Sequence, residues 1–202
     1  MERTMMQKRA PLSDLRRSCL RWREGRKLKW FFAERFSARL LASVDILMRE
    51  MQFASALYLM LLGVEILSGF YEGAQPDRET FCAFISRYMD GVLSLRAPNP
   101  LHRRGVAGGS RDGKGRLTFA EFLWALFRCG FADVCAAYPG GSIAEHSRYY
   151  CRYYSRVGLR LEIHKFYKDF VRAYHRYYSD AVSDYLVRQK FVRRFDQLCG
   201  GR

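Results

Sequence analysis

Residues 53–72 constrain the fold of this chain more than any other segment. They are apolar on nearly all sides of a helix, and Glu65 is the only charge before Glu72. The run is about long enough to cross a membrane. However, Ser55, Glu65 and Ser68 interrupt it, and a central carboxylate costs about 2.5–3.5 kcal/mol on insertion scales. We therefore predict a buried central helix rather than a membrane span.

The other apolar residues predict further helices around this one. Between residues 30 and 51 they recur at three- and four-residue steps, which is typical of an amphipathic helix. Asp77 is placed to cap a third helix. Thr118 followed three residues later by Glu121 is a capping box at the start of a fourth. Besides residues 53–72, we predict helices over residues 30–51, from Asp77 onward, over 118–135 and over 164–198.

Two segments do not follow a helical pattern. Residues 96–116 are rich in glycine, proline and basic residues and are predicted to be a loop. Residues 142–163 alternate in a way that predicts two short strands in a hairpin. The fold class is therefore all-α, a helical bundle of about five helices with a short β-hairpin. We assign residues 1–29 to a basic N-terminal arm, which is either flexible or a weak helix, and residues 30–202 to a single helical domain.

The chain is strongly basic, with a net charge of +15 over 202 residues. The charge is concentrated at both ends, with +7 in residues 1–30 and +7 in residues 145–202, and in residues 103–116 between them. Arginine supplies 28 of the 35 basic residues, and its planar guanidinium makes bidentate contacts with phosphate. This favours a nucleic-acid or phosphate partner. A coding bias toward arginine is the alternative explanation.

The six cysteines are scattered among apolar neighbours and form no zinc pattern with the four histidines. The first thirty residues are charged and have no apolar stretch of the kind found in a signal peptide. Reduced thiols in a cytoplasmic protein are therefore expected. We expect no cofactor, no metal and no membrane partner.

Residues 110–122 resemble a calcium-binding EF-hand loop, with Asp112 inside it and Glu121 at its twelfth position. Against this, Ser110 stands where the first acidic ligand belongs, and Lys114 places an ammonium group at a ligand position. The capping box already explains Glu121. We therefore predict that this loop does not hold calcium.

Residues 124–130, which contain Arg128, carry a lone arginine in an aromatic and apolar segment. This segment resembles the arginine-and-histidine signature of HEPN domains and a stretch found in uncharacterised bacterial helical proteins. The resemblance extends over about residues 30–185. It implies a helical bundle, usually dimeric, in which the arginine holds a phosphate and the histidine moves a proton during metal-independent RNA cleavage.

The expected histidine is replaced in this chain by Asp133. A carboxyl group with an ordinary pKa near 4 moves protons poorly at neutral pH, and a carboxylate repels phosphate. No catalytic residue is therefore firm, and the candidates are Arg128, Asp133 and Glu65. A purely structural salt bridge between Arg128 and Glu65 is the competing interpretation.

Basic and aromatic residues elsewhere are candidates for contact with nucleic acid. Tyrosines alternate with arginines from residue 148 to 156, a pattern that can stack bases and hold phosphates, although packing in a half-buried hairpin is the favoured explanation. The basic face of the last helix is a second candidate surface. The candidate residues are Arg103, Arg104, Arg148, Tyr150, Arg152, Lys165 and Arg172.

The leading hypothesis is a non-catalytic, HEPN-like protein that binds RNA or phosphate and forms a homodimer. One alternative is a structural or protein-interaction module without a nucleic-acid role. The other is a metal-independent ribonuclease, which would need His146 or another base beside Arg128.

Overall fold

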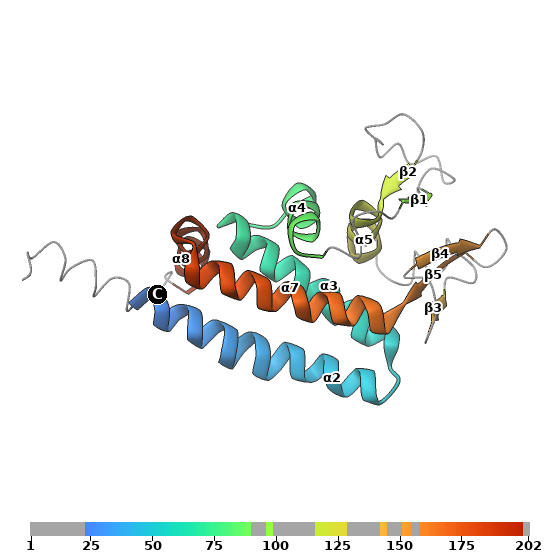
Figure 1. Ribbon diagram of the computed structural model, residues 1–202, viewed down its shortest axis with the longest axis horizontal. Helices are drawn as coiled ribbons and strands as arrows, with labels where there is room; N and C mark the ends of the chain where they lie inside the picture. Colours follow the sequence, from blue (N-terminus) through green and yellow to red (C-terminus); the bar gives the residue numbers. More distant parts are fainter. Residues whose placement is uncertain are drawn as a thin grey trace, which may run out of the picture.

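The computed structural model describes residues 23–89, 96–98, 116–128, 142–144, 151–154 and 158–199. Long helices lie side by side along the longest axis of the molecule, and the short strands gather at one end (Figure 1). The prediction of an all-α helical bundle with a short hairpin is confirmed.

The described part of the first helix runs from residue 23, inside the predicted basic arm, to Arg49. Its middle part, η1 (Trp30–Leu41), is a π-helix, and α2 (Ala42–Arg49) completes it. Backbone bonds in a π-helix span five residues, so residues five apart come together. Phe31 and Phe36 make such a pair, with ring centroids 6.0 Å apart. The boundary predicted at residue 29 therefore lies within a continuous helix, and Leu28 is buried.

The central helix predicted from the apolar run is α3 (Phe53–Glu72). Its mean hydropathy of 1.8 and its length would allow a membrane span, but 56% of the apolar window is buried inside the bundle, as in a core helix. Gly63 lets α7 (Ile163–Ser183) approach closely, because a Cβ atom there would lie 2.6 Å from Phe170. Gly73 ends the helix with φ +76°, a left-handed conformation that favours glycine.

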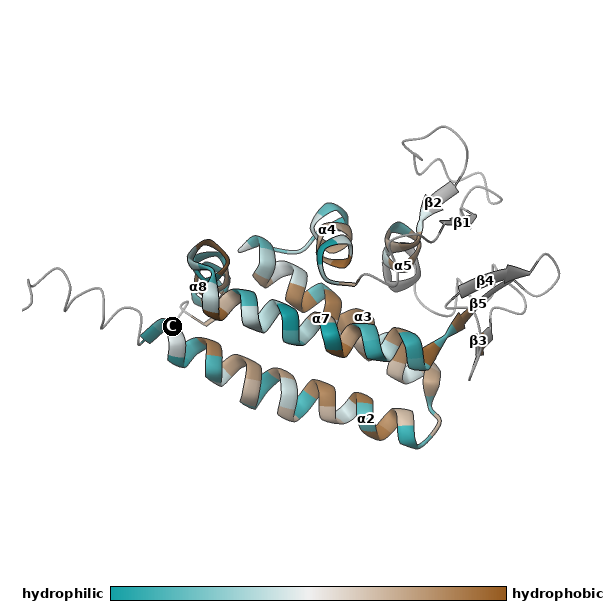
Figure 2. Ribbon diagram, viewed as in Figure 1, coloured by the Kyte–Doolittle hydropathy of each residue, from teal (hydrophilic) through white to brown (hydrophobic). Residues whose placement is uncertain are grey.

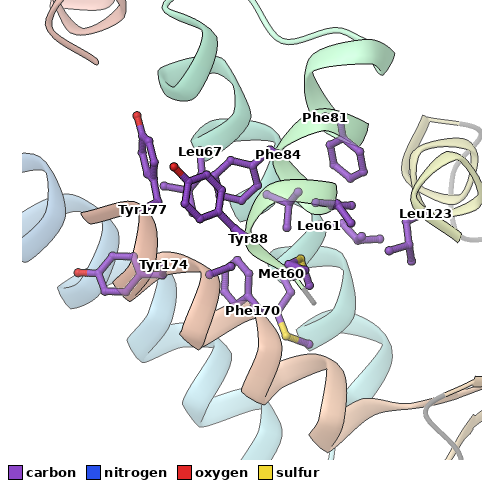
Figure 3. Close-up of a cluster of buried hydrophobic side chains, with 14 of the residues drawn as sticks. Met60, Leu61, Leu67, Phe81, Phe84, Tyr88, Leu123, Phe170, Tyr174 and Tyr177 are labelled. Carbon is purple, nitrogen blue, oxygen red and sulfur yellow. The ribbon is translucent and has the colours of Figure 1, made fainter. Parts of the chain in front are cut away.

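Two shorter helices, α4 (Arg78–Tyr88) and α5 (Phe119–Arg128), pack against α3. Asp77 caps α4 as predicted, since its carboxylate accepts a bond of 2.9 Å from the Thr80 amide. The described part of the fourth predicted helix ends at Arg128, and residues 129–135 lie outside the described ranges. Figure 3 shows Leu123 of α5 beside Leu61 of α3.

The prediction of one long last helix was wrong. The chain breaks at Asp184 into α7 and α8 (Tyr185–Cys199), and α8 folds back against α3 and α7. Asp184 is extended, and its carboxylate accepts bonds from the amides of Leu186 at 2.7 Å and Val187 at 3.3 Å. This side-chain cap starts a new helix in place of continuing the old one.

The predicted hairpin is confirmed in β4 (Cys151–Tyr154) and β5 (Gly158–Glu162), which are antiparallel. The sequence did not predict β3 (Ser142–Ala144), which pairs in parallel with β5 and gives the order β3-β5-β4. The predicted loop over residues 96–116 is closed by an antiparallel pair, β1 (Arg96–Pro98) and β2 (Arg116–Thr118).

Aromatic rings dominate the core. Phe191 of α8 is fully buried, and its ring centroid lies 4.7 Å from that of Phe70, 5.4 Å from Phe31 and 5.7 Å from Phe32. Hydrophilic residues lie along the face of α7 that is turned to the viewer in Figure 2. The amphipathic pattern of α7 therefore fixes which of its faces is buried.

Candidate nucleic-acid interface

The residues suggested by the HEPN resemblance are only partly placed. Arg128 is the last residue of α5, and its side chain, Asp133 and His146 lie outside what the structure describes. Glu65 is half-buried on α3 and lines a hollow of about 230 Å³ together with Arg194 of α8. The salt bridge between Arg128 and Glu65 stays a prediction.

Glu121 has a structural role. Its carboxylate accepts a bond of 2.8 Å from the Thr118 amide, which confirms the capping box, and forms an ion pair of 2.6 Å with Arg78. Burial acts to raise the pKa of Glu121, but the bonds from Thr118 and Arg78 outweigh it and lower that pKa. Asp112 lies outside the described residues. Within the described part of the chain, no three histidine, cysteine or acidic side chains cluster as metal ligands.

Other polar groups near the core are also held in structural contacts. Tyr167 of α7 donates a hydrogen bond to Asp45 of α2, and burial followed by this bond raises the pKa of Tyr167 to about 12. Tyr88 donates to Asp180 at 3.0 Å. Burial raises the pKa of the Cys82 thiol to about 11, so this cysteine is a poor nucleophile at neutral pH.

The hairpin brings two arginines together. Arg152 of β4 is the direct cross-strand partner of Arg160 of β5. Arg152 was a candidate from sequence, whereas Arg160 was not, because its partner is fixed only by the strand register. Arg103, Arg104, Arg148 and Tyr150 lie outside the described residues.

The strand β5 leads directly into α7, so the hairpin and this helix are joined without an intervening loop. Lys168 and Arg172 are exposed, one turn apart, and Lys165 precedes them in a half-buried position. We call Lys165, Lys168 and Arg172 the α7 ridge. The Arg172 guanidinium lies 3.3 Å from the carboxylate of Asp169 and keeps 59% of its side-chain surface exposed. This acidic neighbour orients the arginine without covering it.

Not every basic residue of α7 is available to a ligand. Arg176 donates bonds of 3.4 Å to the carbonyl oxygens of Arg87 and Tyr88, where α4 ends. This contact satisfies carbonyls that have no partner within α4. Arg176 therefore ties α7 to α4, and the α7 ridge lies farther toward the strands.

A second group of basic and aromatic residues lies at the other end of the bundle, where the first helix meets α8 (Figure 1). Trp30 is 41% exposed there, next to Phe195. Residues 23–29 were predicted to belong to an arm, and this site was not predicted, because its two halves are about 165 residues apart. The cluster of basic residues directly before Trp30 is the sequence feature that could have indicated this site.

Comparison of the chain with family models, curated proteins and solved structures finds no match.

Proposed function

We propose that this protein binds RNA through its phosphates, without catalysis, on the surface formed by the β4–β5 hairpin and the α7 ridge. The observation that supports the proposal is the exposure of Lys168 and Arg172 on α7, a helix that follows directly on β5, whose Arg160 is paired in register with Arg152 of β4. A nucleic-acid strand carries one phosphate for each nucleotide, so a row of basic residues can neutralise several phosphates at once. A HEPN-like relationship, a homodimer and a cytoplasmic location belong to the same proposal.

Fluorescence anisotropy with a labelled single-stranded RNA tests this function. We expect binding that weakens steeply as salt is raised, because each neutralised phosphate contributes about −0.7 to the slope of log K against log salt. Arg172→Glu and Arg152→Glu should each weaken binding and make that slope shallower. Arg87→Glu, which reverses an exposed charge on α4, is the matched control and should change binding little.

Absence of binding at low salt would contradict this function and favour a protein-interaction module. The observation that supports such a module is an exposed apolar corner between α7 and α8, where Val182, Tyr185 and Leu186 are 49%, 54% and 68% exposed. Cleavage of the RNA that disappears in Arg128→Ala would instead indicate a ribonuclease.

A further inference from the structure

A hollow of about 760 Å³ opens between the start of the first helix and α8. Its size lies within the range of small-molecule sites, roughly 300–1,000 Å³. The two helix segments that line it meet at the end of the bundle opposite the hairpin (Figure 1). The residues that line it are basic and aromatic with few exceptions: Arg23, Arg26, Lys27, Lys29, Trp30, Ala33, Glu34 and Phe195.

Trp30 is held in place although much of it is exposed. The Arg35 guanidinium lies over its ring, 4.8 Å from the centroid, and the Phe195 ring meets it edge-on at 5.8 Å and 84°. Trp30 and Arg35 are five residues apart, so the π-helical winding of η1 brings them together. In an α-helix the neighbours on one face are three or four residues apart. The Trp30 indole is therefore held in a fixed orientation, and part of its surface is exposed to solvent.

The rim of the hollow is positively charged. Four of its lining residues are basic and one, Glu34, is acidic. Lys27 is already engaged by Asp196 at 2.5 Å and lies 5.7 Å from the centre of the Phe195 ring. Arg23 and Lys29 are exposed on either side along the helix. An anionic group beside the indole would meet these two cations.

We propose that this hollow binds a nucleoside phosphate, with its base stacked on the part of Trp30 that Arg35 leaves open and its phosphate held by Arg23 and Lys29. Stacking on an oriented aromatic ring and charge-assisted bonds to phosphate are the contacts that this chemistry requires. The ligand is a free nucleotide or an unpaired nucleotide of an RNA strand. The site is separate from the interface proposed above.

A membrane surface fits the same residues less well. An amphipathic helix binds a bilayer through a free apolar face. Here Phe31, Phe32 and Phe36 are buried in the bundle, and Trp30 is the large apolar side chain of η1 that remains exposed. The apolar side of this helix is therefore already occupied.

Tryptophan fluorescence excited at 295 nm tests the proposal. Titration with adenosine monophosphate should quench emission and saturate, whereas adenosine alone and inorganic phosphate alone should bind at least about tenfold more weakly. A decaadenylate strand forms the second arm. Quenching by the strand without binding of the free nucleotide supports the site if it persists in Arg172→Glu and disappears in Trp30→Phe, and it then identifies an RNA strand as the source; strand binding that is lost in Arg172→Glu and leaves Trp30 unquenched counts against the site.

Variants separate the two contacts. Trp30→Ala should weaken binding at least about fivefold through lost stacking, and Trp30→Phe should keep binding by calorimetry while removing most of the quenching. Lys29→Glu changes an exposed residue, so it keeps the fold and should weaken binding severalfold. Arg87→Glu should have no effect. Circular dichroism verifies that each variant is folded.

Three results would overturn the proposal. The first is affinity for inorganic phosphate equal to that for the nucleotide. The second is unchanged affinity in folded Trp30→Ala or Lys29→Glu protein. The third is a response to vesicles of phosphatidylserine, or to polyglutamate, with none to nucleotide or strand. If RNA binding is lost in Arg172→Glu but adenosine monophosphate still quenches Trp30, the two sites are independent.

Discussion

At the scale of single residues, the packing of this bundle depends on a glycine in the helix contact. Gly63 on α3 faces Phe170 of α7, and an added Cβ atom would lie 2.6 Å and 2.9 Å from two ring carbons. Atoms in a close-packed interior cannot approach this closely without displacement. Because glycine carries only a hydrogen atom in place of a side chain, α3 and α7 can lie this close together at Gly63.

Gly63→Ala should destabilise the protein by about 1–3 kcal/mol, because the extra methyl group overpacks the contact with Phe170. Gly25→Ala is the matched control. A Cβ atom there meets nothing within 4 Å, and the gain in helix propensity should stabilise the protein by about 0.5–1 kcal/mol. Urea unfolding of the two variants measures both changes. Equal effects of the two substitutions would contradict this account of the helix contact.

At the scale of elements, the starts of α4, α5 and α8 are defined by side-chain caps, and one of these caps should depend on pH. The pKa of Glu121 is lower in the folded protein than its ordinary value of 4.5. Its contribution to stability is therefore fully present above that value and is lost as the pH falls below it. Thr118 and Arg78 supply the contacts that favour the charged form.

Glu121→Gln should lower the free energy of unfolding by about 0.5–1.5 kcal/mol at pH 7, through a weaker cap and the loss of a partly exposed ion pair. At pH 3 the difference from the unchanged protein should become smaller. Urea unfolding at pH 7, 5 and 3 measures this trend. Glu50→Gln, at an exposed position, serves as control. A difference that grows as the pH falls would exclude the proposed role of the carboxylate.

The same caps explain how far the sequence predicts the elements. The starts of α4 and α5 were predictable because Asp77 and Thr118 act on amides three residues away. The break at Asp184 was missed because the aromatic stripe continues across it. Strands β1 and β3 were missed because short strands are defined by distant partners. The α7 ridge could be predicted from the spacing of its residues on one helix. The hollow at Trp30 could not, because Phe195 lines it from the far end of the chain.

At the scale of the whole molecule, the first helix and α8 hold each other in place. Lys27 pairs with Asp196 at 2.5 Å, and Glu24 lies 3.5 Å from Arg188. Leu28, directly after Lys27, is only 2% exposed. Residues 23–29 therefore belong to the folded domain and help to close the bundle.

A chain that begins at residue 30 should be less stable than one that begins at residue 23, by about 2–5 kcal/mol. The loss of the buried Leu28 side chain accounts for most of this decrease in stability. Each of the two ion pairs contributes at most about 1 kcal/mol. Thermal unfolding followed by circular dichroism compares the two chains. Leu28→Ala in the full chain should reproduce most of the loss, and equal melting temperatures would place these residues outside the domain.

The burial of Phe191 also has a consequence for the order in which the protein can fold during synthesis. Its ring packs against Phe31, Phe32 and Phe70. These three rings cannot be fully packed until Phe191 has been synthesised, more than 120 residues after Phe70. A nascent chain exposes apolar surface until such distant contacts form. Chaperones that recognise aromatic surface should therefore act on this protein between the emergence of α3 and that of α8 from the ribosome.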